Sequence, residues 1–132
     1  MLRLIVLISG NGSNLQAIID ACESNAIDAK VVAVISNNFN AFGLERAKKH
    51  KIPVVVVDNK DYESRNDFDE KLLYEINSFM PDLVVLAGFM RILTPLITSA
   101  FKGMMINIHP SLLPKYPGMN THQKVLNNKD NI

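Results

Sequence analysis

Two polar side chains, Asn107 and His109, stand two positions apart at the end of an apolar segment that starts at Met104. Successive side chains of a β-strand point to opposite faces, so Asn107 and His109 share one face while Ile106 and Ile108 share the other. An amide that donates a hydrogen bond and an imidazole that titrates near neutral pH can together stabilise negative charge and move a proton. The pair therefore predicts a catalytic site.

The residues after His109 indicate a rigid loop. Pro110, Pro114 and Pro117 follow closely, and Gly118 ends the run. Proline fixes φ and has no amide donor, so this loop cannot pair as a strand and holds its neighbours in place. A histidine near a strand end is most often a surface or capping residue, but the adjacent asparagine and the stiff loop favour a functional pair.

A second candidate site is the sequence Gly-Asn-Gly-Ser-Asn at residues 10–14, between the first apolar run and the first helical segment. A helix N-terminus offers free amides to an anion, and glycine lets the backbone approach it closely. The loop lacks the Lys-Ser/Thr ending of a Walker loop. Leu15 replaces the third glycine of the dinucleotide fingerprint, and Asn37 and Asn38 stand where an acidic residue would hold a ribose. A phosphate monoester therefore fits better than NAD; an ordinary turn without ligand is the alternative.

Composition excludes several classes of protein. The chain has 132 residues, 48% of them hydrophobic and 20% charged, with a net charge of +1. This balance is typical of one globular domain, which we assign to residues 1–132, and offers no electrostatic reason for a nucleic acid partner. The longest apolar run, residues 83–90, is far shorter than the ~20 residues of a membrane span. The single cysteine, Cys22, excludes an internal disulfide and favours the cytoplasm.

Short apolar runs alternate with helical segments along the chain. Strands are predicted at residues 2–9, 30–36, 53–57, 83–86 and 104–109. Helices are predicted from Ser13, where Gln16 completes a capping-box spacing, and at residues 41–47, 65–79 and 94–101. This alternation predicts a three-layer, Rossmann-like α/β fold: an open, mostly parallel sheet with helices on both faces.

The carboxyl ends of parallel strands meet at one edge of a sheet, where ligands gather. Three polar strand exits would lie there, at residues 9–14, 88–91 and 107–109. The residues Gly88-Phe89-Met90 would line a pocket, because a glycine after a buried strand lets a flat ring approach closely. An apolar strand exit that packs on a neighbouring helix is the alternative. Cys22 belongs to the apolar stripe of the first helix and is read as core, and no cluster of side chains has metal-ligand spacing.

Four separated stretches carry a resemblance to a known family. Residues 6–22, 41–47, 84–93 and 107–118 resemble the phosphoribosylglycinamide formyltransferases (GAR transformylases), which are folate-dependent enzymes of purine synthesis. The resemblance runs from the first strand to about Leu126 and implies the N-terminal part of the formyltransferase fold. The Asn-x-His-Pro-Ser-Leu-Leu-Pro run is shared by folate formyltransferases and hydrolases, whereas the Ser-Gly-Asn-Gly-Ser-Asn start points to the glycinamide ribonucleotide branch.

The resemblance implies transfer of a formyl group from 10-formyltetrahydrofolate, the co-substrate, to the amine of glycinamide ribonucleotide. It assigns the 5′-phosphate to Gly12, Ser13 and Asn14. It assigns the formyl-folate pocket to the following residues: Arg65, Met90, Arg91, Ile92, Leu93 and Asn107. Asn107 and His109 match two members of a catalytic trio: the amide stabilises the oxyanion formed when the amine attacks the formyl carbon, and the imidazole carries the proton to the leaving nitrogen.

The resemblance has two departures. Asn120 stands where the family usually has histidine. The third catalytic member is an aspartate that raises the pKa of the histidine; no residue matches it before Ile132, and Asp130 lies in the wrong motif. The chain is therefore expected to be truncated at its C-terminus and to have little transformylase activity, since loss of a histidine-orienting carboxylate can cost on the order of 10⁴ in rate.

Three other functions compete with formyl transfer. Formyltetrahydrofolate hydrolysis is one, and a non-catalytic phosphate- or nucleotide-binding remnant is another. A dinucleotide-dependent oxidoreductase is disfavoured by Leu15 and by Asn37 and Asn38. The expected partners are the two small-molecule substrates, with no metal, nucleic acid or membrane. An uncovered flank of the fifth strand would also make a homodimer possible.

Overall fold

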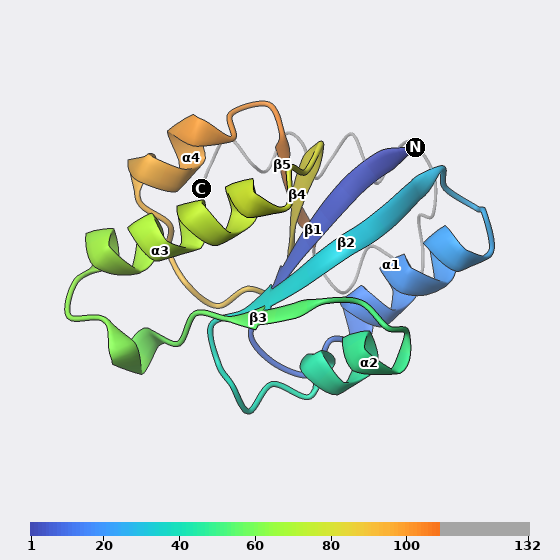
Figure 1. Cartoon of the computed structure of the whole chain (residues 1–132), viewed down its shortest axis with the longest axis horizontal. Helices are drawn as coiled ribbons and strands as arrows, with labels where there is room; N and C mark the ends of the chain where they lie inside the picture. The colour runs from blue at the N-terminus through green and yellow to red at the C-terminus, as the bar shows by residue number, and fades with distance from the viewer. Residues whose placement is uncertain (109–132) are drawn as a thin grey trace.

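Apolar runs form the strands of the computed structural model, which describes residues 1–108 (Figure 1). The strands are β1 (Leu2–Ile8), β2 (Ala29–Ser36), β3 (Val54–Val56), β4 (Leu83–Ala87) and β5 (Met105–Ile108). The helices are α1 (Ser13–Glu23), α2 (Gly43–Lys49), α3 (Arg65–Ser78) and α4 (Pro95–Ala100), with a short 3-10 turn, η1 (Asn59–Asp61), before α3. The predicted alternation of strands and helices is confirmed for these residues.

The strands form one parallel sheet in the order β3-β2-β1-β4-β5. From the central strand β1 the chain moves outward through β2 to β3, and then returns to place β4 on the other side of β1. The direction of winding thus reverses between β1 and β4. In open α/β sheets such a reversal opens a crevice beyond the carboxyl ends of the two strands, and ligands bind there.

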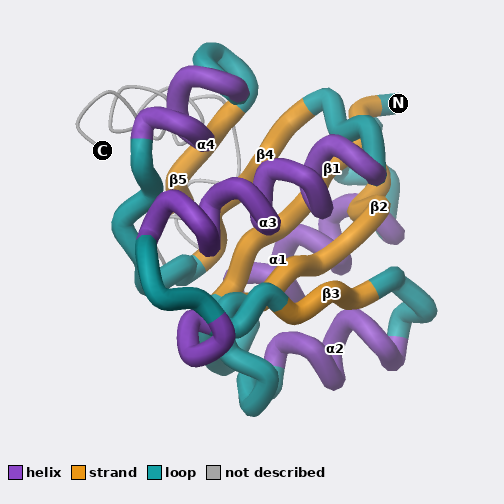
Figure 2. Tube along the Cα trace, turned by 60° about the vertical axis from the view of Figure 1, so that its left-hand side comes forward, coloured by secondary structure: helices purple, strands orange, loops and turns teal. Residues whose placement is uncertain are grey.

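Helices cover both faces of the sheet, with α3 and α4 on one face and α1 and α2 on the other (Figures 1 and 2). On the first face, Ile5 and Leu7 of β1 pack with Phe68, Leu72 and Ile76 of α3, and all five side chains are fully buried. The α3 residues recur at helical spacing, so one stripe of the helix faces the sheet. Burial of each such side chain is worth about 1.5–3 kcal/mol.

The opposite face is built from the alternate residues of the same strand. Val6 and Ile8 of β1 pack with Leu15 and Ile19 of α1. Cys22 lies at the edge of this cluster and is partly buried, as expected for a core position rather than a reactive thiol. Because side chains of β1 alternate between two cores, β1 has an almost continuous apolar sequence.

Two of the helices begin with side-chain caps. The hydroxyl of Ser64 accepts a hydrogen bond from the Asp67 amide at 3.1 Å, at the start of α3. The hydroxyl of Thr94 accepts one from the Leu96 amide at 3.3 Å, with Pro95 as the first residue of α4. The predicted Thr-Pro start of α4 is confirmed.

The predicted capping box at the start of α1 is wrong. Gly12, not Ser13, is the N-cap residue, and it has the left-handed conformation with φ 81° and ψ 24°. No side chain of residues 1–108 caps this helix, because the left-handed turn at glycine brings the chain directly into the helix and makes Ser13 its first residue. Gln16 instead donates to Asp20 at 3.0 Å.

Three strands are shorter than predicted, and β1 ends at Ile8 rather than at Ser9. β3 starts at Val54, because Pro53 has no amide for the ladder and contributes only its carbonyl, which accepts from the Val34 amide at 2.9 Å. β5 is described to Ile108, so the predicted last residue, His109, lies outside the described residues. In residues 1–108, no helix has the length and apolar character needed to cross a membrane.

Candidate functional site

The loops after β1 and β4 are joined directly across the reversal point of the sheet. The hydroxyl of Ser9, which follows β1, accepts a hydrogen bond from the amide of Met90, which follows β4, at 2.7 Å. The same hydroxyl donates to the side-chain oxygen of Asn37 at 2.6 Å. Ser9 therefore connects the ends of three neighbouring strands.

The connection continues to the end of β3 and back to β4. The Asn59 amide donates to the Asn37 carbonyl at 3.3 Å, and Arg91 Nη1 donates to Asn59 Oδ1 at 2.9 Å. Asn37 is 3% exposed, so it serves the network rather than solvent. No binding or positioning role was predicted for Asn37 or Asn59 from the sequence. Their positions just after the ends of β2 and β3 could have indicated such a role.

Residues 10–14 form what we call the anion cradle, at the N-terminus of α1. The first hydrogen bond of this helix runs from the Gln16 amide to the Gly12 carbonyl at 2.8 Å. The amides of Ser13, Asn14 and Leu15 precede it, and within residues 1–108 they donate to no other group of the protein. Amides in this position, at the positive end of the helix dipole, are suited to bind an anion.

The cradle packs tightly against the start of α2. A Cβ atom on Gly12 would lie 2.6 Å from Cα of Gly43, and the Gly43 amide donates to the Gly10 carbonyl at 3.0 Å. Gly12 thus needs to be glycine for two reasons, its positive φ and this backbone contact. Gly43 was not singled out from the sequence, because only the docking of α2 onto the cradle reveals its contact.

Residues 88–93 form what we call the pocket loop. Met90 is 82% exposed and Ile92 is 65% exposed, whereas Leu93 is buried. Gly88 has φ 76°, and among residues 1–108 no atom lies within 4 Å of the place where a Cβ would stand. Two large exposed apolar side chains beside an open glycine suit a flat, partly apolar ligand.

The pocket loop also contacts the first turn of α3. The Arg91 guanidinium carbon lies 3.9 Å from the centre of the Phe68 ring. Arg65, the first residue of α3, stands three residues before Phe68 and is exposed, with no hydrogen bond or ion pair to residues 1–108. The structure therefore brings Arg65 and the Met90–Arg91 pair to the same end of α3.

A buried carboxylate anchors the end of the pocket loop. Asp69 of α3 is fully buried, and its Oδ2 accepts from both the amide and the hydroxyl of Thr94 at 2.7 Å. Its other oxygen has no partner among the described residues. Asp69 was not predicted from the sequence, because it belongs to no recognised motif and because its burial depends on the packing of α4 against α3.

Asn107 lies near the end of β5, opposite Leu86 of β4, and is half-buried. Met105 packs into the α3 side of the sheet and Ile108 packs on the α1 side, so alternation places Asn107 on the α3 side. The remaining predictions fall outside the described residues and stay predictions; they concern His109, the proline loop to Gly118, Asn120 and Asp130.

A cavity of about 520 Å³ lies at the opposite edge of the sheet, where Arg3, Lys30 and His50 are among its lining residues. It includes none of the predicted site residues. Catalytic chemistry is better supported at the carboxyl edge, where unpaired helix amides and strand-end polar groups converge. Within residues 1–108 no group of three His, Cys, Asp or Glu side chains is arranged to hold a metal ion.

Comparison with known proteins identifies the family. Residues 2–132 match the formyl transferase family. The chain belongs to this family. The formyl transferase chain is 54% identical over 129 residues to phosphoribosylglycinamide formyltransferase of Escherichia coli (strain K12), covering 98% of this chain and 61% of that protein. It is 50% identical over 131 residues to the Haemophilus influenzae protein of that name, covering 99% and 62%.

A solved structure is similar over almost all of this formyl transferase chain. The phosphoribosylglycinamide formyltransferase of Coxiella burnetii superposes with a TM-score of 0.80 and 49% identity, covering 96% of this chain and 60% of that one. The predicted family and the parallel α/β fold are therefore confirmed. The chain spans about three fifths of the length of these relatives.

Proposed function

We propose that this chain acts in formyl transfer from 10-formyltetrahydrofolate to the amine of glycinamide ribonucleotide, a step of de novo purine synthesis. The observation that carries the proposal is the pairing of two unlike loops at the reversal point of the sheet. One presents unpaired amides at a helix N-terminus, the other presents exposed apolar side chains, and Ser9 joins them at 2.7 Å. Relatives named phosphoribosylglycinamide formyltransferase support the choice of substrates.

The anion cradle is the proposed site of the ribonucleotide's 5′-phosphate. The amides of Gly12, Ser13 and Asn14 would donate to phosphate oxygens, and the exposed Ser13 hydroxyl would add a side-chain donor. Because Gly12 has no side chain and adopts the left-handed conformation, the phosphate can approach the backbone closely. The substrate amine would then extend toward the ends of β4 and β5.

The pocket loop is the proposed site of the folate. Exposed Met90 and Ile92 offer apolar contacts to a flat ring, and the open space beside Gly88 leaves room for it. Arg65 at the start of α3, whose positive charge has no partner among residues 1–108, would contact an anionic group of the folate. When bound, 10-formyltetrahydrofolate supplies the formyl group that is transferred.

Asn107 and His109 are the proposed catalytic residues. The Asn107 amide would donate a hydrogen bond to the formyl oxygen, where negative charge develops as the substrate amine attacks. Such a donor is commonly worth about 10²–10³ in rate. His109 would take part in moving the proton from the attacking amine to the nitrogen that leaves, so that the new C–N bond forms as the old one breaks.

Calorimetric titration of the 132-residue chain with glycinamide ribonucleotide and with 10-formyltetrahydrofolate tests this proposal. We expect each to bind at one site, and Asn107→Ala to slow any formyl transfer while leaving ribonucleotide affinity unchanged. Asn66→Ala, on the exposed side of α3, is the matched control. Formate release without ribonucleotide binding would indicate a hydrolase. Phosphate-ester binding without folate binding would indicate a binding module.

The proposal also covers the cell compartment and the oligomeric state. We place it in the cytoplasm, since one partly buried cysteine suits a reducing compartment. Within residues 1–108, β3 and β5 are the edge strands of the sheet, so pairing of two copies through an edge is a further proposal. Size-exclusion chromatography with light scattering measures it, and a monomer at micromolar concentration would count against it.

A further inference from the structure

We infer that Arg46 is a positioning residue that holds the anion cradle in its binding conformation and so controls the affinity for a phosphate ester. The inference rests on the proposed function of the cradle. Arg46 belongs to α2, outside the residues assigned to either substrate.

Arg46 contacts the cradle through both edges of its guanidinium group. Its Nε donates to the Asn11 carbonyl at 2.8 Å, and its Nη2 donates to the Asn11 side-chain oxygen at 2.7 Å. Its Nη1 lies 3.4 Å from Oε1 of Gln16 in α1. This forked contact to one residue resembles the bidentate geometry that arginine forms with two oxygen acceptors.

The contact determines where the cradle's amides point. In a trans peptide the carbonyl and the amide hydrogen point in opposite directions. Because Arg46 holds the Asn11 carbonyl toward α2, the Gly12 amide of that peptide points away from α2. The Gly43 amide does the same to the preceding peptide by holding the Gly10 carbonyl at 3.0 Å, so the Asn11 amide also points away. Two successive amides directed to one side form a concavity suited to an anion.

Arg46 acts through the loop rather than on the ligand. Its three donor nitrogens are directed to Asn11 and Gln16, and its guanidinium carbon lies 5.1 Å from the centre of the Phe42 ring. The ring and the acceptors together fix the orientation of the planar group. Lysine would keep the positive charge but lose the fork, so charge and geometry can be separated by substitution.

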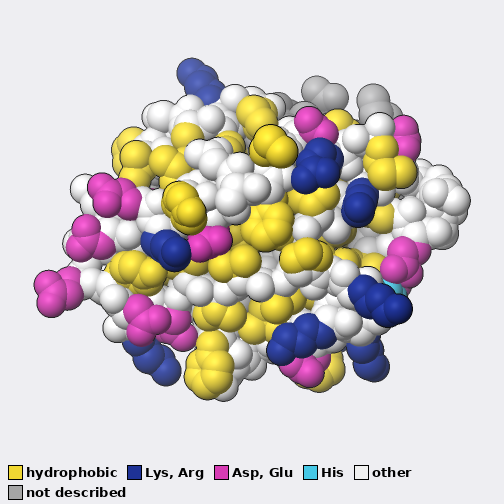
Figure 3. Space-filling model, viewed as in Figure 1, with side chains coloured by type: hydrophobic (Ala, Val, Ile, Leu, Met, Phe, Trp, Pro, Cys, Tyr) yellow, Lys and Arg dark blue, Asp and Glu magenta, His cyan; other side chains and the backbone are white. Residues whose placement is uncertain are grey.

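The test compares Arg46→Met and Arg46→Lys with Lys49→Met in the same helix. Lys49 is exposed and forms no hydrogen bond or ion pair with residues 1–108, so its substitution removes a charge without touching the cradle. Figure 3 shows other Lys and Arg side chains over the α2 region, which makes the control necessary. The probes are inorganic phosphate, glycinamide ribonucleotide and 10-formyltetrahydrofolate.

Loss of two charge-assisted hydrogen bonds predicts that Arg46→Met binds the ribonucleotide and phosphate roughly 30-fold more weakly. Arg46→Lys should bind about 5-fold more weakly and Lys49→Met within about 2-fold of the natural chain. Folate affinity should change less than about 2-fold in all three, because the pocket loop is held from α3. Equal ribonucleotide affinities for Arg46→Met and Lys49→Met would overturn the inference. If Arg46→Met does not fold, equal affinities for Arg46→Lys and Lys49→Met would overturn it.

A measurement without ligand separates this inference from the proposed function. We expect the {¹H}-¹⁵N NOE of the Gly12 amide to fall in Arg46→Met and Arg46→Lys but not in Lys49→Met. If the natural chain binds no ribonucleotide and Gly12 still loosens, the proposed function fails while the positioning role stands. If Gly12 is as ordered in Arg46→Met as in the control, the positioning role is wrong whatever the chain binds.

Discussion

The anion cradle and the pocket loop occupy equivalent places after adjacent strands, yet they differ in chemistry, and we propose a different ligand for each. The cradle follows β1 and offers backbone amides at a helix N-terminus. The pocket loop follows β4 and exposes the apolar side chains of Met90 and Ile92. In the proposed function, the cradle holds the charged ester and the pocket loop holds the flat ring beside it.

The two loops are also held from opposite faces of the sheet. The cradle is held by Gly43 and Arg46 of α2, and the end of the pocket loop is held by Asp69 of α3. The Ser9–Met90 hydrogen bond is the direct link between them that the described residues show. This arrangement implies that the two halves of the site can be weakened independently.

The largest effect is expected from Gly12→Ala, compared with Gly88→Ala. Both glycines have positive φ, which costs alanine about 1 kcal/mol. Within residues 1–108, the new Cβ at Gly12 would also meet backbone, 2.6 Å from Gly43 Cα, while no described atom lies within 4 Å of the Gly88 position. We expect unfolding free energy to fall by about 3 kcal/mol for Gly12→Ala and about 1 kcal/mol for Gly88→Ala in urea titrations. Equal losses would show that the cradle is not clamped by α2.

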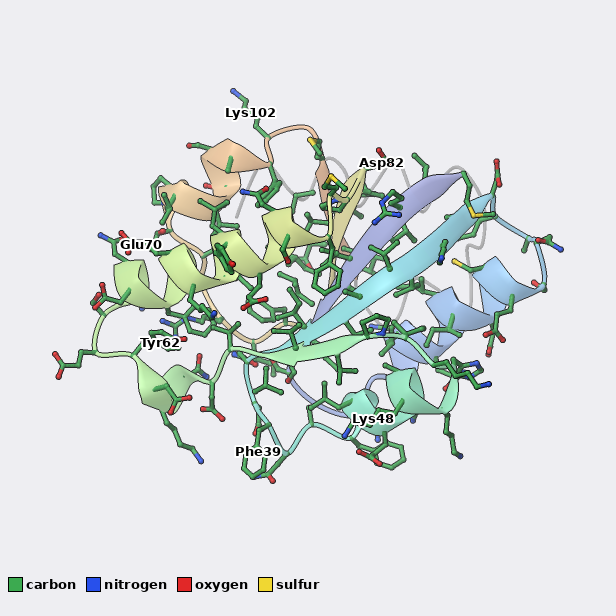
Figure 4. The ribbon with its side chains drawn as sticks, in the orientation of Figure 1. Phe39, Lys48, Tyr62, Glu70, Asp82 and Lys102 are labelled. Carbon is green, nitrogen blue, oxygen red and sulfur yellow. The ribbon has the colours of Figure 1, made fainter. Side chains whose placement is uncertain are left out.

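Asp69→Ala should act on the pocket loop alone. It leaves the partly buried Thr94 amide and hydroxyl without their acceptor, which predicts a loss of about 2 kcal/mol and weaker folate binding. Glu70→Ala is the control, because Glu70 is exposed and lies on the outer side of α3 (Figure 4). Denaturation and titration with both ligands measure this, and a parallel loss of ribonucleotide affinity would contradict the independence of the two halves.

Ser9→Ala removes the link between the loops. The Met90 amide and the Asn37 side chain each lose a partner, so about 1 kcal/mol of stability should be lost. Ser13→Ala is the comparison, since the exposed Ser13 hydroxyl has no partner within residues 1–108. It should leave stability within about 0.5 kcal/mol while lowering ribonucleotide affinity. Equal unfolding free energies for Ser9→Ala and Ser13→Ala would show that the Ser9–Met90 hydrogen bond does not stabilise the fold.

The smallest effect concerns Cys22, at the far end of the helix that starts in the cradle. Burial, and then the Glu23 carboxylate, raise the pKa of the Cys22 thiol above its ordinary 9.0. The unfolded thiol therefore loses its proton first, and stability falls as pH rises from the ordinary value through the raised one. The native chain should react with iodoacetamide at higher pH than the urea-unfolded chain, with Cys22→Ser as the blank. Overlapping pH profiles would be evidence against burial of this thiol.

Much of the fold follows from local pattern. The strand and helix positions were predicted because buried strands are continuously apolar and α3 repeats at helical spacing. The predicted start of α1 at Ser13 is confirmed, but the capping box predicted from the spacing of Ser13 and Gln16 is wrong, because the left-handed Gly12 is the N-cap residue. No local pattern distinguishes a glycine that turns the chain from one that only precedes a cap.

The residues assigned to the candidate site from the sequence stay predictions. Gly12, Ser13 and Met90 were selected because each stands in a motif that follows a strand. Asp69 and Arg46 were not found, because each looks like one charge among several on an amphipathic helix. Their partners, Thr94 and Asn11, lie 25 and 35 residues away in the chain. Contacts of this separation depend on how helices dock.

The sequence by itself determined the alternation of strands and helices and the family, and it predicted an anion site at the first loop, since each depends on neighbouring residues and their spacing. Only the tertiary structure decided that β4, rather than β3, lies beside β1 opposite β2. That order places the cradle next to the pocket loop and leaves α2 and α3 to hold them from opposite faces. Strand order comes from the packing of whole layers, in which many weak contacts between distant residues act together.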